Sequence, residues 1–247
     1  MVGRLVFRGF IVGIVAGLLA FGWARTFGEP AVETAIGFEA AQDQAKAAAA
    51  VAAGKPAPDD DPVIFSRAVQ SGIGLLTGMV VTGAGLGCLF AVLFAFANGR
   101  LGRLGAAPTS ALLALFGLLS VYVVPALKYP ANPPSVGEPD TIKYRTGLYF
   151  LLMAISIATT LGALRVRQAL LPRHGAWNAS LLAAGVYLVV IAAVFALLPG
   201  INEVPASFPA VTLWNFRIAS LGIQAVLWGS IGILFGYIGA RGARGAR

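Results

Sequence analysis

The sequence predicts an all-α integral membrane protein, a polytopic bundle of about six transmembrane helices. Apolar residues make up 58% of the 247 residues and charged residues only 11%, whereas about a quarter of residues are charged in an ordinary soluble domain. The apolar residues are also gathered in six runs, each long enough for a helix to cross about 30 Å of hydrocarbon. These runs cover residues 5–24, 68–97, 107–127, 146–164, 178–198 and 217–239.

The apolar runs leave little chain for a separate soluble domain, so residues 1–247 are expected to form a single integral membrane domain. The main polar insertion covers residues 25–67, between the first and second runs. It is predicted to hold an extracytoplasmic amphipathic helix followed by a linker. The linker contains Asp59, Asp60 and Asp61 among prolines, which is typical of a flexible surface loop.

The first apolar run begins with basic residues, as a signal peptide does. However, Gly9, Gly13 and Gly17 recur every four residues within it. Such a ridge of small residues lets a second helix approach closely in lipid. This spacing favours a retained transmembrane helix over a cleaved segment.

The charges predict the orientation of the chain. The net charge of +8 does not indicate nucleic acid binding, because the basic residues form short clusters beside apolar runs, where they face membrane lipid. Basic loops stay in the cytoplasm, which places both termini there. All ten acids fall on the opposite, outer side and predict a surface that attracts cations. The cytoplasmic cluster residues are Arg4, Arg8, Arg100, Arg103, Arg165, Arg167, Arg173, Arg241, Arg244 and Arg247.

Four carboxylates follow the first run within fifteen residues: Glu29, Glu33, Glu39 and Asp43. Pro30 suits the first turn of a helix, and on that helix the four acids span an arc of roughly 120°. Carboxylate oxygens bind divalent cations, so these acids are candidate metal ligands. The alternative is a solvated helix face whose acids only contact water.

Other polar residues add candidates. Asn132 and Glu203 lie in two proline-rich outer loops and offer further oxygen ligands. Arg217 and Gln224 enter the last apolar run, where polar groups must face the bundle or a wet cavity, and Arg217 is expected to pair with Glu203. The only histidine, His174, is a weak candidate for an exit-side ligand on the cytoplasmic side.

Three long segments resemble the CbtA family of probable cobalt transporter subunits: GEPAVETAIGFE at 28–39, LKYPANPPSVGEPDTIKYRTGLYF at 127–150, and LPGINEVPASFPAVTLWNFRIASLGIQAVLW at 198–228. The resemblance covers essentially the whole chain. It implies a component of Co²⁺ uptake in the bacterial cytoplasmic (inner) membrane, linked to cobalamin supply, with Co²⁺ as substrate and no resident cofactor. It also implies about five spans and a partner, CbtB, a short single-span protein with a histidine-rich end.

Two other functions stay open at this point. The chain could be a small membrane subunit that binds a vitamin-like organic solute and uses separate ATPases, or a non-transporting scaffold. A homo-oligomer is compatible with each. An enzyme is not expected, because the sequence contains no HExxH or GxSxG motif and no paired intramembrane carboxylates. Since cobalt prefers some imidazole nitrogen and the outer side has no histidine, the first function requires a histidine-rich partner.

Overall fold

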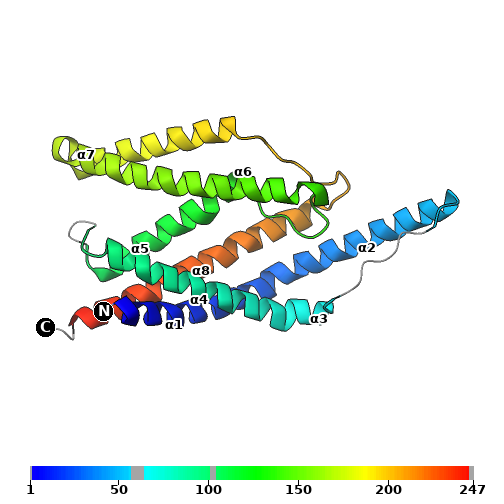
Figure 1. The fold of residues 1–247 in the computed structure, drawn as a ribbon, viewed down its shortest axis with the longest axis horizontal. Coiled ribbons are helices and arrows are strands. Elements are labelled where there is room, and N and C mark those ends of the chain that lie inside the picture. The colour runs from blue at the N-terminus through cyan, green and yellow to red at the C-terminus, as the bar shows by residue number, and fades with distance from the viewer. Residues whose placement is uncertain (1, 57–63, 101–103, 245–247) are drawn as a thin grey trace. The chain divides into compact units, whose positions relative to one another are not determined.

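The computed structural model describes residues 2–56, 64–100 and 104–244, and all regular structure in these ranges is helical (Figure 1). The all-α prediction is therefore confirmed. The chain folds as two compact units, and the single domain expected for residues 1–247 stays a prediction. The first unit comprises the described residues of Met1–Leu115, Ala131–Val136 and Val204–Arg247, and the second comprises Phe116–Pro130 and Gly137–Glu203.

The first unit is built from long helices joined by π-helical turns. Its elements are α1 (Val2–Trp23), the π-helical turn η1 (Ala24–Gly28), α2 (Glu29–Ala52), the short α3 (Arg67–Val69), the π-helical turn η2 (Gln70–Gly74), α4 (Leu75–Ala97), α5 (Ala106–Gly117, whose last residues enter the second unit) and α8 (Ala210–Arg244). The second unit contains the π-helical turn η3 (Leu118–Val123), α6 (Val124–Lys128), the 3₁₀ turn η4 (Pro139–Thr141) and α7 (Ile142–Leu197).

The helix expected within residues 25–67 is a direct continuation of the first apolar helix. Helices α1, η1 and α2 follow one another without a break from Val2 to Ala52, a run of 51 residues. At 1.5 Å per residue this helix is about 77 Å long, more than twice the hydrocarbon thickness of a bilayer. Asp59, Asp60 and Asp61 of the predicted linker lie outside the described residues.

The glycine ridge of α1 packs against α4, as the sequence predicted. A Cβ atom added to Gly13 would lie 2.8 Å from the carbonyl carbon of Gly83, and one added to Gly17 would lie 2.5 Å from the carbonyl oxygen of Met79. The two backbones therefore touch directly. Two further small residues, Gly87 and Ala91, face Gly9 in the same way.

Helix α8 completes the core of the first unit. The Ser110 hydroxyl on α5 donates a hydrogen bond of 2.8 Å to the carbonyl oxygen of Gly232. Phe235 packs edge-on against Phe90 and Phe94 of α4, with ring centroids 5.4 and 5.0 Å apart. These rings are buried, and they join α4 to α8 through apolar contact.

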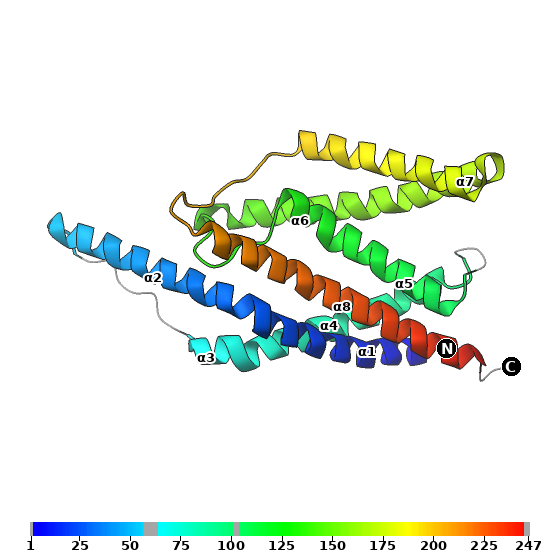
Figure 2. The same cartoon turned by 180° about the vertical axis from the view of Figure 1, so that it is seen from behind.

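Helix α7 contains two of the predicted apolar runs. Its 56 residues would span about 84 Å if straight, but Gly175 has a φ of 70° and a ψ of 171°, which are not helical angles. The ribbon of α7 turns back on itself in both views (Figures 1 and 2). Positive φ favours glycine because it has no Cβ. Within the part of the chain that the structure describes, five helices are long and apolar enough to cross a membrane when α7 counts once. Because Gly175 divides α7 into two helices, all six predicted runs are helical.

The second unit has its own apolar core around Tyr129, Leu148 and Leu152, all buried. Two polar contacts tie the end of α6 to the end of α7. The Lys128 ammonium donates a hydrogen bond of 2.8 Å to the carbonyl oxygen of Phe195, and the Tyr129 hydroxyl donates one of 2.8 Å to Pro199. Desolvation raises the pKa of Tyr129, so its hydroxyl stays a neutral donor.

Candidate functional site

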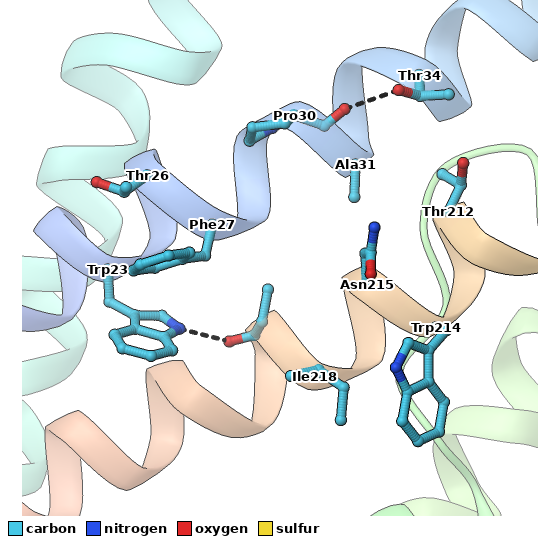
Figure 3. Close-up of a pocket in the computed structure, with 11 residues that line it drawn as sticks. Trp23, Thr26, Phe27, Pro30, Ala31, Thr34, Thr212, Trp214, Asn215 and Ile218 are labelled. Atoms are coloured by element: carbon cyan, nitrogen blue, oxygen red, sulfur yellow. Dashed lines mark hydrogen bonds between the residues drawn. The ribbon is translucent and has the colours of Figure 1, made fainter.

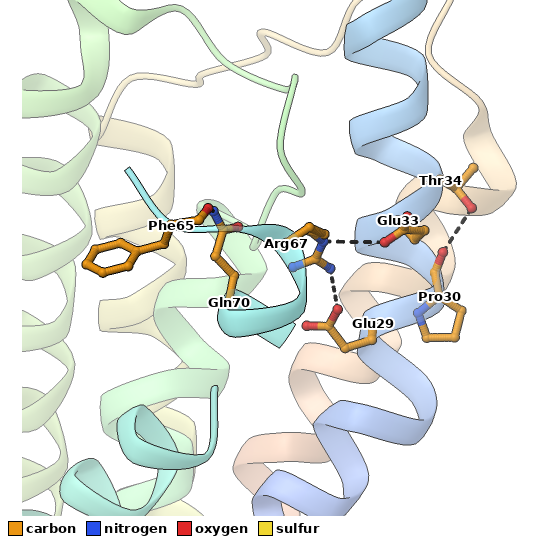
Figure 4. Close-up of polar contacts among 7 residues, drawn as sticks. All are labelled: Glu29, Pro30, Glu33, Thr34, Phe65, Arg67 and Gln70. Atoms are coloured by element: carbon orange, nitrogen blue, oxygen red, sulfur yellow. Dashed lines mark hydrogen bonds and ion pairs between the residues drawn. The ribbon is translucent and has the colours of Figure 1, made fainter. Parts of the chain in front are cut away.

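Two of the predicted acids converge on one arginine at the junction of η1 and α2. Arg67 contacts the Glu29 carboxylate through Nη2, and its Nε lies 3.3 Å from the Glu33 carboxylate (Figure 4). Glu29 keeps only 13% of its side-chain surface exposed, whereas Glu33 keeps 71%. We call Glu29, Glu33 and Arg67 the ion-pair cluster. Its two carboxylates are four residues apart and so lie on the same helix face.

Local contacts hold Arg67 in place. Ser66 is the N-cap of α3, and its hydroxyl accepts a hydrogen bond of 3.4 Å from the backbone N–H of Val69. The side-chain amide of Gln70 donates one of 3.0 Å to the carbonyl oxygen of Phe65. These contacts close the chain around Arg67, so that its guanidinium is presented to α2 by a short, folded turn.

Each side of the ion-pair cluster adjoins a π-helical turn. The turn η1 ends at Gly28, immediately before Glu29, and η2 begins at Gln70, immediately after α3. A π-helical turn bonds residues five apart, and it occurs mostly as a local bulge near functional positions. Such a turn changes the direction in which the following side chains point, and Glu29, which contacts Arg67, is the first residue after η1.

The other two acids of α2 stay apart from the ion-pair cluster. Glu39 and Asp43 are exposed, and Asp43 pairs with Lys46 at 3.0 Å, where both side chains are more than 60% exposed. Among the described residues, no three His, Cys, Asp or Glu side chains gather into a metal-binding group. The assignment of the four acids as metal ligands stays a prediction.

Arg217 pairs with Asn132, so the prediction that it pairs with Glu203 is wrong. Its Nη2 donates a hydrogen bond of 2.9 Å to the side-chain oxygen of Asn132, and its Nε donates one of 3.3 Å to the carbonyl oxygen of Ala131. The guanidinium therefore binds the loop 131–136 to α8. A charge near the start of an apolar helix is satisfied in this way by a neutral amide and a backbone carbonyl.

An apolar contact joins the same loop to α2. Ala35 of α2, Val136 and Phe208 form a buried cluster, and Phe38 packs edge-on against Phe208 with ring centroids 5.1 Å apart. Parts of all three segments that carry the family resemblance thus meet within the first unit.

Glu203 joins two segments of the second unit, and we call its contacts with Glu138 and Arg145 the Glu203 clamp. Its Oε2 accepts a hydrogen bond of 2.8 Å from the backbone N–H of Glu138 and lies 3.2 Å from Nε of Arg145. The bond from Glu138 lowers the pKa of Glu203 most, followed by the side chain of Thr141, and Arg145 lowers it further. These contacts occupy Glu203 within the protein, and its role as a metal ligand stays a prediction.

We expect Glu203 to make the stability of the protein pH-dependent. Its folded-state pKa lies below the ordinary value of 4.5, so it stabilises the fold above that value, and the contribution is lost as the pH falls through the folded-state pKa. Thermal unfolding in detergent between pH 7 and pH 3 should show a smaller acid-induced loss for Glu203→Gln than for the wild type. Equal pH profiles would contradict this prediction.

A groove opens between the η1–α2 junction and α8. Its volume is about 520 Å³, and it carries aromatic rings on its walls and no charged side chain (Figure 3). The indole of Trp23 donates a hydrogen bond of 3.2 Å to the carbonyl oxygen of Ala219 and stacks at a tilt on Phe27, 4.3 Å between centroids. The groove is lined by Trp23, Thr26, Phe27, Pro30, Ala31, Thr34, Thr212, Trp214, Asn215, Ile218 and Ala219.

The two remaining candidates lie elsewhere. Gln224 is half-buried on α8, two turns beyond Arg217, and stays a predicted pathway residue. His174 is exposed, next to the reversal of the chain at Gly175. Sequence reasoning gave no specific role to Arg67 or Arg145. Arg145 closely follows Glu138 and Asp140 in the sequence, a signal that could have identified it, whereas the partners of Arg67 lie 34 and 38 residues before it and no local signal indicates them.

One of three comparisons with known proteins found a match. No curated protein and no solved structure matches the chain significantly. A family model described as "Probable cobalt transporter subunit (CbtA)" matches residues 2–239, nearly the whole length, and it includes the ion-pair cluster, the Arg217 contact and the Glu203 clamp. The family is described as one of transporter subunits, and five helices in the described part of this chain are long and apolar enough to cross a membrane. The chain therefore belongs to the CbtA family of probable cobalt transporter subunits.

Proposed function

We propose that this protein is the membrane subunit of a Co²⁺ uptake transporter and that Glu29 and Glu33 capture the ion. The observation that carries the proposal is the convergence of both carboxylates on a single cationic group, the Arg67 guanidinium. Two carboxylates one helical turn apart already hold a positive charge at this point. Hard and borderline divalent cations favour such oxygen ligands.

The other acids have a supporting role in the proposal. Glu39 and Asp43 are exposed on the same helix, where they attract cations over a range that salt shortens to about 8 Å at physiological ionic strength. Gln224 follows as a polar group along α8. Asn132 and Glu203 keep the loops in place. They can serve as metal ligands only if the ion replaces their present contacts with Arg217 and Arg145, respectively.

The proposal includes a partner and a location. The carboxylates offer only oxygen, while cobalt usually takes some imidazole nitrogen, and the only histidine is His174. A single-span, histidine-rich CbtB-like subunit would supply this nitrogen. The basic clusters support a bacterial inner-membrane protein with both termini in the cytoplasm, and the imported cobalt would serve cobalamin synthesis.

The test is uptake of radiolabelled Co²⁺ by cells that lack their own importers and express this chain with the histidine-rich partner. We expect Glu29→Gln/Glu33→Gln to lower uptake at least about 10-fold at equal membrane abundance, because both capturing charges are removed. The matched control, Glu39→Gln/Asp43→Asn, removes two charges from the same helix and should lower uptake less than about 3-fold.

A further variant separates capture from folding. Glu29→Gln/Glu33→Gln leaves Arg67 without its counter-charges, which by itself destabilises a partly buried site. Adding Arg67→Gln removes this unpaired charge, and the triple variant should still lack uptake. Uptake equal to the wild type in the double variant would contradict the capture site.

The groove of about 520 Å³ favours a second function, the binding of a vitamin-like organic solute. Its size falls in the range of small-molecule sites, and such sites combine apolar walls with few polar groups. In the uptake experiment, a lack of Co²⁺ transport by the wild type with its partner would support this second function.

A further inference from the structure

The ion-pair cluster carries an inference about selectivity, which rests on the proposed capture of Co²⁺ by Glu29 and Glu33. We infer that Arg67 is a specificity-determining residue: a tethered cation that keeps the carboxylate pair closed to monovalent ions and yields to a divalent ion.

The geometry makes Arg67 a competitor for any ion that approaches the pair. Its guanidinium contacts both carboxylates, and only 29% of its side-chain surface and 13% of that of Glu29 remain exposed. Glu33 stays 71% exposed, but an ion that bridges both carboxylates must take the place of the guanidinium, since little open carboxylate surface remains on Glu29. Arg67 is also part of the same chain, so its effective concentration at the pair is on the order of millimolar or higher.

The charge balance decides which ions succeed. Two carboxylates and one guanidinium leave a formal charge of −1. A monovalent ion that replaces Arg67 restores the same charge, loses its own hydration and breaks two charge-assisted hydrogen bonds, so it gains little. A divalent ion brings the pair to neutrality, and its attraction to each carboxylate is twice as large. Arg67 thus raises the concentration that any cation needs to occupy the pair, and it raises this concentration most for singly charged cations.

The surrounding helix allows the exchange. Arg67 begins the three-residue helix α3, and the first residue after that helix, Gln70, begins the π-helical turn η2. Conversion of a π-helical turn to an α-helical one rotates the residues on one side relative to the other by roughly 100°, the angle of one residue. The same conversion in η1 would rotate Glu29. A local change in hydrogen bonding is therefore enough to separate Arg67 from the pair.

The experiment compares Arg67→Gln with Lys46→Gln in the Co²⁺ uptake assay, with the partner present, at about 0.01 M and about 0.15 M NaCl. Lys46 is a matched control, because it also neutralises an acid on α2 but is 69% exposed and lies 13 residues beyond Glu33 on that helix, about 20 Å away at 1.5 Å per residue. Arg67→Gln should lower the KM for Co²⁺ about 10-fold at low salt with little change in kcat. At the higher salt its KM should rise about 10-fold, because Na⁺ now competes for the open pair.

The wild type and Lys46→Gln should both show less than about a 3-fold rise in KM over this salt range. Arg67→Lys keeps the charge but cannot bridge two carboxylates as well, and it should fall between the wild type and Arg67→Gln; it also serves as the test if Arg67→Gln fails to accumulate. KM values and salt dependence equal to the wild type for the Arg67 variants would overturn the inference.

The result also separates this inference from the proposed function. If Glu29→Gln/Glu33→Gln abolishes uptake while the Arg67 variants behave as the wild type, the capture site stands and the selectivity role is wrong. If the glutamate double variant transports normally, both are wrong. A Co²⁺-dependent rise in Tm of the purified protein that is larger for Arg67→Gln than for the wild type would support the inference without transport.

Discussion

Replacing Gly83 with leucine is expected to disrupt the packing of α1 on α4 and to lower the Tm of the protein by roughly 10 °C. A Cβ atom at Gly83 would lie 3.0 Å from both Cα and N of Gly17, and closer still to the carbonyl oxygen of Gly13. These neighbours are backbone atoms, which cannot move aside by changing a rotamer. The helices must separate, and in lipid such close contact is a main source of helix association.

Gly85 provides the matched control for this prediction. It lies two residues away on the same helix, is exposed, and has no neighbour within 4 Å of an added Cβ. Gly85→Leu should leave the Tm unchanged or raise it slightly, because leucine favours the helix. Thermal unfolding of the two variants in the same detergent checks the prediction. Equal Tm values for Gly83→Leu and Gly85→Leu would show that the α1–α4 contact is not rigid.

Gly137→Ala is expected to destabilise the protein by about 3 kcal/mol, since two effects add there. Gly137 has a φ of 122°, a conformation that disfavours any residue with a Cβ. The added Cβ would also lie 2.6 Å from Nη2 of Arg145. Arg145 could move away, but it would then lose its contact with Glu203 and its 3.2 Å hydrogen bond to the carbonyl oxygen of Glu138.

The control is Gly147→Ala, a helical and exposed position on α7 with open space around an added Cβ, which should be neutral or slightly stabilising. A double-mutant cycle divides the cost. In a Glu203→Gln background, Gly137→Ala should cost less, because part of the clamp is already lost. Additive changes in the free energy of unfolding would attribute the whole effect to backbone strain at Gly137.

The sequence predicted the helices well because hydrophobic length is a local property. Each of the six apolar runs became helical, and the spacing of Gly9, Gly13 and Gly17 predicted a close helix contact. The partner residues Gly83 and Gly87 are also four apart, and this spacing indicates a helix face that another helix can approach closely. The continuity of α1 with α2 was harder to predict from the sequence, because the change from apolar to acidic composition resembles the end of a helix.

The candidate site was predicted only in part, since its contacts join residues far apart in the chain. Glu29 and Glu33 were identified from their spacing on a helix. Arg67 lies 38 and 34 residues beyond them, and no local pattern indicates that contact. For Arg217, closeness in sequence favoured Glu203, whereas its partner Asn132 lies 85 residues away. Loop closure over such distances depends on tertiary packing.

The unbroken helix from Val2 to Ala52 can act as a lever, because it is long and is fixed near one end. One end is held against α4 by direct backbone contact, while the other end extends about 45 Å beyond a hydrocarbon layer of about 30 Å if the helix stands upright. Any small tilt at the glycine contact is therefore magnified at Ala52. The ion-pair cluster lies near the middle of this lever, so a shift within the bundle and the release of Arg67 would be mechanically linked.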